Sequence, residues 1–166
     1  IGRRGHDPIL AEPGHVRDTV RVTQSDEANG EQRVTAALDA SGLDYRVVRH
    51  GRVSSLAEAA AARGVEPRDV IKTIVVRRGD DDFLLVLVPG DRAIAWPKLR
   101  DLLGVNRLSM PDADTAFAAT GFVRGTITPF GTAKAWPVYA DERIVGREVS
   151  LGGGAHGVAV AISADE

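Results

Sequence analysis

A loop with two glycines and a proline, Gly-Thr-Ile-Thr-Pro-Phe-Gly at residues 125–131, is the segment of this sequence best suited to binding a ligand through its backbone. Glycine reaches positive φ and carries no side chain, and proline fixes φ, so such a loop bends sharply and lets a ligand approach its amide groups. Backbone N–H groups held in this way stabilise a developing oxyanion, and the loss of one such donor typically costs about 10²–10³ in rate. A plain turn is the alternative interpretation.

Lys72 lies within an apolar, β-branched run, Val-Ile-Lys-Thr-Ile-Val-Val at residues 70–76. An ammonium group in such surroundings is costly to desolvate, so it must reach solvent, pair with an acid or face a cleft. For a strand lysine considered alone, reaching solvent is the commoner outcome. In a cleft, its positive charge would anchor an anionic or carbonyl oxygen of a ligand.

His156 follows the glycines of residues 152–154 and precedes an apolar run at 158–162. The glycine spacing formally matches the dinucleotide-binding fingerprint, but that fingerprint requires a following helix, whereas a strand pattern follows here. We therefore interpret the segment as a glycine turn that presents His156 to a pocket. A histidine with a purely structural role in the turn is the alternative.

The composition is that of one compact domain, with 166 residues, 43% hydrophobic residues and a formal net charge of −2. The sequence has no cysteine, which excludes disulfides and thiolate chemistry, and its scattered histidines do not predict a metal site. No run approaches the roughly 20 apolar residues of a membrane span, so we expect a cytoplasmic protein without metal, cofactor or membrane partner. The charge does not indicate extensive nucleic-acid contact, although local clusters of basic residues would suit one or two phosphates if they are not simply solvated. These clusters are Arg46, Arg49 and Arg52; Arg77 and Arg78; and Lys98, Arg100 and Arg107.

Glycine and proline divide the sequence into its elements. Residues 1–29 lack a sustained apolar period and are predicted to be a flexible or irregular tail, with the domain spanning residues 30–166. Capping and termination signals predict helices from about residue 31 to Gly42, from Ser54-Ser55 to Gly64, from Pro97 to Gly104 and from Pro111 to Gly121.

Strand patterns occur at residues 43–47, 71–77, 83–88, 136–139, 148–151 and 158–162. The runs at 71–77 and 83–88 predict a central antiparallel hairpin, whose second strand is apolar on both faces and therefore covered on both sides. Asp141 is expected to cap the segment that follows it. Helices and strands in this mixed order predict a single α+β domain, with a mixed, mostly antiparallel central sheet flanked by helices.

Together these features resemble the YbaK/ProX-like aminoacyl-tRNA deacylases, a family related to the editing domain of bacterial prolyl-tRNA synthetase. The resemblance covers roughly residues 31–162 and implies a YbaK-like fold. It also implies hydrolysis of the ester that joins a mischarged amino acid to the terminal ribose of tRNA. The matching features are Lys72-Thr73 in a strand, Val88-Pro89-Gly90-Asp91 after the next strand, Gly125-x-x-x-Pro129, Pro137-Val138 followed by Asp141, and Gly153-Gly154-x-His156.

By this resemblance, Lys72, Gly125 and His156 are the catalytic residues. Lys72 would fix the polar end of the ligand or the ester carbonyl, the loop at Gly125 would polarise the acyl carbonyl, and His156 would orient a water or the ligand's amino group. No serine or cysteine has a recognisable nucleophile setting, so we expect direct hydrolysis by water, or hydrolysis helped by a functional group of the substrate itself, rather than an acyl-enzyme. The expected substrate-binding residues are Thr73, Thr126, Ile127, Thr128, Pro129, Phe130 and Gly154.

The implied partner is the 3′-terminal aminoacyl-adenosine of tRNA, and an additional synthetase partner is left open. The sequence does not determine the amino acid, the tRNA or the oligomeric state. A hydrolase is favoured, and the alternative is a noncatalytic binding module that retains the aminoacyl-adenosine pocket. A deacylation assay across several mischarged tRNAs separates the two hypotheses.

Overall fold

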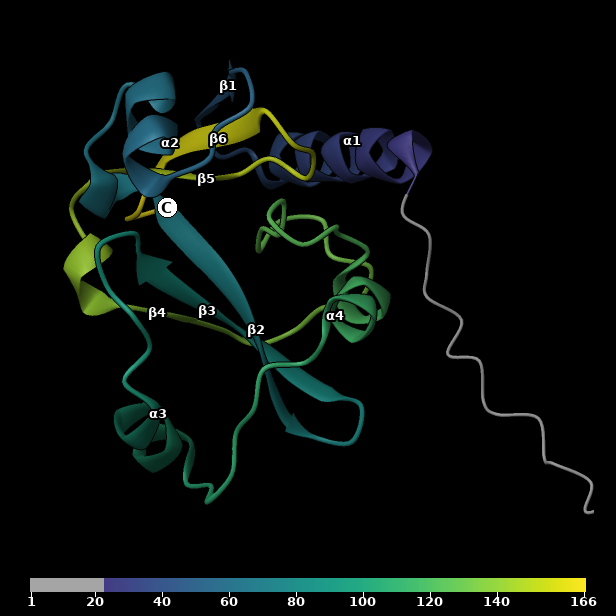
Figure 1. Cartoon of the computed structure of the whole chain (residues 1–166), viewed down its shortest axis with the longest axis vertical. Coiled ribbons are helices and arrows are strands. Elements are labelled where there is room, and N and C mark those ends of the chain that lie inside the picture. The colour runs from purple at the N-terminus through teal and green to yellow at the C-terminus, as the bar shows by residue number, and fades with distance from the viewer. Residues whose placement is uncertain (1–22) are drawn as a thin grey trace, which may run out of the picture.

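The computed structural model describes residues 23–166, which form an α+β domain with four α-helices and two three-stranded sheets (Figure 1). This confirms the predicted fold class. Within these residues, no helix combines the length and apolar character needed to cross a membrane. The helices are α1 (Gln24–Ser41), α2 (Leu56–Arg63), α3 (Trp96–Leu103) and α4 (Ala113–Thr120); the strands are β1 (Tyr45–Arg49), β2 (Ile71–Gly79), β3 (Asp82–Pro89), β4 (Val138–Ala140), β5 (Glu148–Gly152) and β6 (Val158–Ser163).

The strands divide between two sheets, and a parallel bridge from Val70 to Ser150 links them. One sheet has the order β1-β6-β5 and is antiparallel throughout. In the other, β2 and β3 form the predicted antiparallel hairpin and the short strand β4 adds to β3 in parallel. Strand β2 is therefore an edge strand, and this edge borders the site described below.

The β2–β3 hairpin is covered on both faces because its apolar side chains alternate between two clusters. On one face, Val75 and Leu85 pack with Ala116 of α4. On the other face, Val76 and Leu84 pack with a leucine of α3. In Figure 1, α3 and α4 accordingly lie on different sides of the hairpin. The expectation that the second hairpin strand is covered on both sides is thus confirmed.

The helix C-termini follow the sequence signals closely, whereas the starts of α4 and α1 differ from them. Each of the four helices is followed by a glycine in the left-handed conformation, as the sequence predicts. Helix α4 begins at Ala113 rather than at Pro111, because the Asp112 carboxylate accepts a hydrogen bond from the Thr115 amide and so makes Asp112 the N-cap. Asp141 also caps the turn after it, accepting a hydrogen bond from the Arg143 amide.

Helix α1 begins earlier than the sequence pattern indicates. Thr23 and Asp26 form a reciprocal capping box, so the helix starts at Gln24. Residues 24–29, which the sequence analysis assigned to the tail, are therefore helical, and the boundary at residue 29 is corrected. The remainder of the predicted tail, residues 1–22, lies outside the described residues.

Candidate functional site

A cavity of about 310 Å³ lies between the outer edge of β2 and the loop that follows α4. Aliphatic side chains dominate its walls, and one cation, Arg124, and one acid, Asp112, also contribute. A cavity of this size and character suits a small, mostly uncharged group. The lining residues are Thr73, Ile74 and Val75 from β2; Met110, Pro111, Asp112, Ala113 and Ala116 around the start of α4; and Arg124, Gly125 and Ile127 from the loop.

The edge of β2 turns backbone donors and acceptors towards this cavity. Arg77 exchanges two hydrogen bonds with Ser109 across the outer edge, at 2.7 and 3.1 Å. Because backbone groups alternate in direction along an antiparallel strand, Val75 and Thr73 point their N–H and C=O groups to the same outer edge. The hydroxyl oxygen of Thr73 is buried, and no partner for it occurs within residues 23–166. This edge can therefore hydrogen-bond a polar ligand.

Gly125 adopts φ of +89°, the left-handed geometry that the glycine-proline pattern predicts for this loop. The amide and hydroxyl of Thr126 both donate to the Val123 carbonyl, at 3.0 and 2.7 Å, so these two donors hold the turn. Thr128 is fully buried, and its hydroxyl has no hydrogen-bond partner in the described part of the chain. Of the loop residues after Gly125, Ile127 lines the cavity.

Arg33 of α1 fixes both ends of this loop. Its guanidinium donates to the Gly121 carbonyl at 2.6 Å and to the Gly131 carbonyl at 3.1 Å, and it lies 4.8 Å from the centre of the Phe122 ring. Pro129 and Phe130 sit between these two anchors and are partly buried, so they contribute to the rigidity of the loop. A fixed loop is required if its amides are to act as preorganised donors.

His156 is held by a carboxylate from α1. Glu27 accepts a hydrogen bond from the His156 amide at 3.1 Å and contacts Nδ1 of its ring at 2.9 Å. The hydrogen bond from the His156 side chain lowers the pKa of Glu27. With Nδ1 as the donor, Nε2 of the neutral ring becomes an acceptor. Nε2 lies 3.4 Å from the point where a Cβ on Gly125 would stand, so this acceptor is beside the open face of the loop.

Gly154 is the packing centre between α1, the loop and the histidine turn. Its amide donates to the Thr126 carbonyl at 3.2 Å, and its own φ is +86°. A Cβ at Gly154 would lie 2.5 Å from the Gly30 carbonyl oxygen of α1, closer than real Cβ contacts. Only glycine permits this approach, so Gly154 sets the position of His156 relative to the loop.

Lys72 lies on the face of β2 opposite to Thr73, because adjacent side chains of a strand point in opposite directions. Its ammonium donates to the Arg92 carbonyl, and it is not among the residues that line the cavity. The structure therefore brings Thr73, Gly125 and Ile127 together and sets His156 beside them, with Lys72 on the adjoining face. An ammonium has three donors, so two remain for a ligand that extends along the strand.

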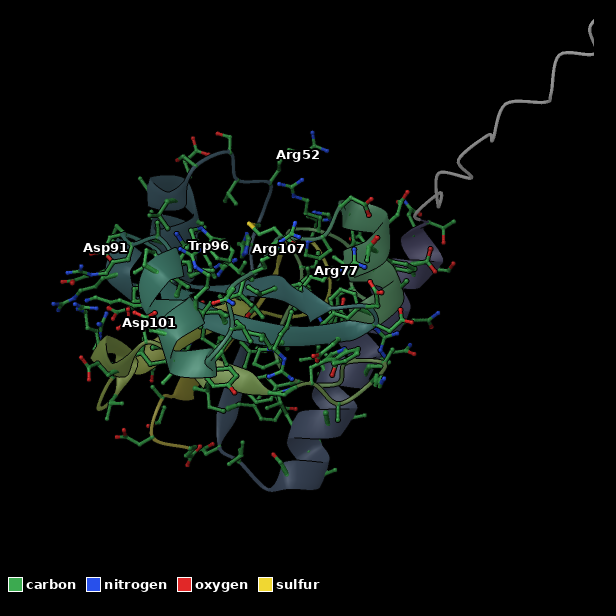
Figure 2. All side chains as sticks on the ribbon, turned by 90° about the horizontal axis from the view of Figure 1, so that it is seen from below. Arg52, Arg77, Asp91, Trp96, Asp101 and Arg107 are labelled. Carbon is green, nitrogen blue, oxygen red and sulfur yellow. The ribbon has the colours of Figure 1, made fainter. Side chains whose placement is uncertain are left out.

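Most arginines near the hairpin are already paired with acids. Arg77 and Arg78 bind Asp80 and Asp82, and the hydrogen bond to Asp82 raises the pKa of Arg78. Arg77 also lines a hollow with Arg107, on the side of the molecule shown in Figure 2. Within residues 23–166, no group of three or more His, Cys, Asp or Glu side chains could hold a metal ion.

Three residues of this site were missed by the sequence analysis. Arg124 directly precedes Gly125, and its position next to the loop was the available signal. Glu27 shares a helix face with the buried Gly30 and Val34 at i, i+3 and i+7 spacing, a pattern that could have been recognised. Nothing in the sequence pattern identifies the carbonyl partners of Arg33, which are 88 and 98 positions away.

Comparison with known proteins places this geometry in one family. Residues 50–166 match the aminoacyl-tRNA editing domain. The proline–tRNA ligase of Heliobacterium modesticaldum is 35% identical over 96 residues, which is 55% of this chain and 16% of that protein. The corresponding ligase of Desulforamulus reducens is 32% identical over 130 residues, covering 74% of this chain and 22% of the ligase. The chain thus spans about a fifth of the length of these relatives.

A solved structure with the same fold aligns over most of both chains. It is that of a protein proposed to be a trans-editing enzyme for prolyl tRNA synthetase, and its TM-score is 0.74 with 28% sequence identity. The alignment covers 81% of this chain and 86% of the other. The YbaK-like architecture expected from the sequence is therefore confirmed.

Proposed function

We propose that this chain, which belongs to the aminoacyl-tRNA editing domain family, hydrolyses the ester bond of a mischarged aminoacyl-tRNA and acts in trans. The products would be free amino acid and tRNA, and a tRNA substrate would place the activity in the cytoplasm. One observation supports the proposal most directly. The open face of Gly125, the Nε2 acceptor of His156 and the hydrogen-bonding edge of β2 converge beside one cavity.

In this proposal the amino-acid side chain enters the cavity between β2 and Ile127. The edge carbonyl of Thr73 or Val75 receives the ligand's α-ammonium group, since a charged donor and a carbonyl form a strong hydrogen bond. The amide of Gly125 polarises the acyl carbonyl, and its preorganisation stabilises the oxyanion. A water held by Nε2 of His156 then attacks the acyl carbon.

Lys72 acts at the polar end of the ligand. A substrate that runs along the β2 edge passes from the face of Thr73 to the face of Lys72, where the two remaining N–H donors can bind a phosphate or ribose oxygen. Arg124 adds positive charge to the cavity wall, and Arg107 lines a separate hollow together with Arg77 of β2. This local charge would compensate for a net charge that is otherwise slightly negative.

The experiment that tests this function is a deacylation assay with purified protein and a panel of charged tRNAs. Because the relatives are proline–tRNA ligases, tRNA for proline charged with noncognate amino acids is the first substrate to test. Faster release of one or more amino acids than in buffer supports the hydrolase. Binding of aminoacyl-tRNA without any release across the panel would overturn it and favour the noncatalytic binding module.

A further inference from the structure

Helix α1 contributes a carboxylate to the candidate site from outside the segment that matches the editing family. Glu27 lies 23 positions before the start of that match at residue 50. Its two oxygens contact His156 separately, one at the amide and one at the ring. A carboxylate that binds both the backbone and the ring of one histidine restricts its χ angles and its tautomer together.

We propose that Glu27 is a positioning residue: it holds His156 in the tautomer and orientation that direct Nε2 towards the Gly125 loop. This inference rests on the proposed hydrolase function, because it assigns a role in orienting the attacking water. Without Glu27, the neutral ring could carry its proton on either nitrogen and rotate away from the loop. Only the form with an unprotonated Nε2 can accept a hydrogen bond from the water.

The position of Glu27 is itself fixed by packing. One turn further along α1, a Cβ at Gly30 would lie 2.2 Å from the Gly154 carbonyl oxygen, so the helix and the histidine turn are in direct backbone contact. Val34 continues the same face and is fully buried in the core. The Glu27 carboxylate is therefore held by a helix that packs on the core and not by a flexible segment.

Other charged groups near His156 cannot replace Glu27. The hollow around the ring is lined by Glu27, His50 and Arg52, with glycines and a valine completing it. Nδ1 of His50 contacts its neighbouring carbonyl at 2.8 Å, and Arg52 carries a positive charge. Arg124, next to Gly125, is likewise cationic. Among the residues that line this hollow, Glu27 is the anion available to a histidine N–H.

The test compares Glu27→Gln and Glu27→Ala with a matched control, Glu31→Ala. Glu31 lies one turn away on α1 and pairs with Arg49 rather than with His156. On a tRNA that the parent deacylates, both Glu27 variants should lower kcat by up to about 10²-fold, since misplacement on the order of 1 Å costs that much. KM should change little, because Glu27 contacts His156 and not the ligand, and the control should behave like the parent.

A double-mutant measurement separates positioning from simple support of the fold. In a His156→Ala background, Glu27→Ala should have no additional effect on kcat. A full additional loss in that background would overturn the proposal, as would a parent-like kcat in the Glu27 variants.

A substrate-free measurement keeps this inference distinct from the proposed function. When the His156 ring is in its neutral form, its ¹⁵N shifts should report a proton on Nδ1 in the parent and a mixture of tautomers in Glu27→Ala. Identical tautomer populations in both proteins would overturn the positioning role even if deacylation is observed. If the parent releases no amino acid from any tRNA, the hydrolase function fails. The tautomer populations still show in that case whether Glu27 sets the tautomer of His156.

Discussion

Replacement of Gly125 by alanine should slow deacylation far more than it lowers stability. The residue has φ of +89°, where a Cβ costs on the order of 1–2 kcal/mol. For a domain of this size, about 1 kcal/mol shifts the melting temperature by roughly 2–4 °C. The new Cβ would also lie 3.4 Å from Nε2 of His156, in van der Waals contact on the open face of the loop. The fold should therefore survive with a melting temperature lowered by a few degrees.

The catalytic effect follows from the same contact. The added methyl group fills the space between the loop and Nε2, so a water or acyl oxygen that would use this space is displaced. Displacements on the order of 1 Å in a reacting geometry cost about 10²-fold in rate. Single-turnover hydrolysis by Gly125→Ala should accordingly fall by roughly this factor.

Gly146 offers a control with the same backbone strain and no neighbour. Its φ is +75°, and a Cβ there meets no atom within 4 Å. Gly146→Ala should lose about as much stability as Gly125→Ala and should deacylate at the parental rate. Gly79→Ala, where the Cβ would lie at a relaxed 3.8 Å from the Asp82 side chain, should be nearly silent in both measurements. Near-normal rates for all three variants would contradict a role for the Gly125 loop in the active site.

Further outcomes follow from the other site residues. Lys72→Ala should keep the fold, because the ammonium is only partly buried, and should reduce kcat/KM while weakening its dependence on salt; an unchanged kcat/KM on every substrate would contradict the proposed role. Thr73→Val removes a buried hydroxyl that has no partner in the described residues, so its melting temperature should be equal or higher, while KM should rise if the hydroxyl contacts the ligand. The hydrogen bond from His156 lowers the pKa of Glu27. The stabilisation that this bond gives the folded protein is therefore complete above the ordinary glutamate pKa of about 4.3, and it is lost as the pH falls through the lowered pKa of Glu27. Melting curves of Glu27→Gln should lack this part of the acid dependence, and curves that parallel the parent at every pH would contradict it.

Features that depend on neighbouring residues could be predicted from the sequence. The glycines that end the helices and the positive φ of Gly125 follow from the conformational freedom that glycine alone has. The two covered faces of β3 follow from its unbroken apolar run, since alternate side chains need a partner on each side. The hairpin of β2 and β3 was also predictable, because it joins two apolar runs that are adjacent in the sequence.

Features that depend on contacts between distant residues were beyond the sequence pattern. The apolar period of α1 begins only at Gly30 and Val34, so residues 24–29 lacked a hydrophobic reason to be helical. What extends the helix is a capping box at Thr23 together with a contact between Glu27 and a residue 129 positions later. The face on which Lys72 lies depends likewise on the packing of the hairpin between α3 and α4, which no local signal determines.

Helix α1 organises the site through three contacts on one side of its axis. Glu27 holds the histidine, Gly30 packs on the turn that carries it, and Arg33 binds both ends of the glycine-proline loop. The family match begins at residue 50, so it contains the loop and the histidine without the helix that sets their relative positions. Because a backbone oxyanion site depends on preorganisation, donors that are present but not held in place contribute little. We therefore predict that the smallest unit able to perform the proposed chemistry is larger than the family match and includes α1 from at least Glu27.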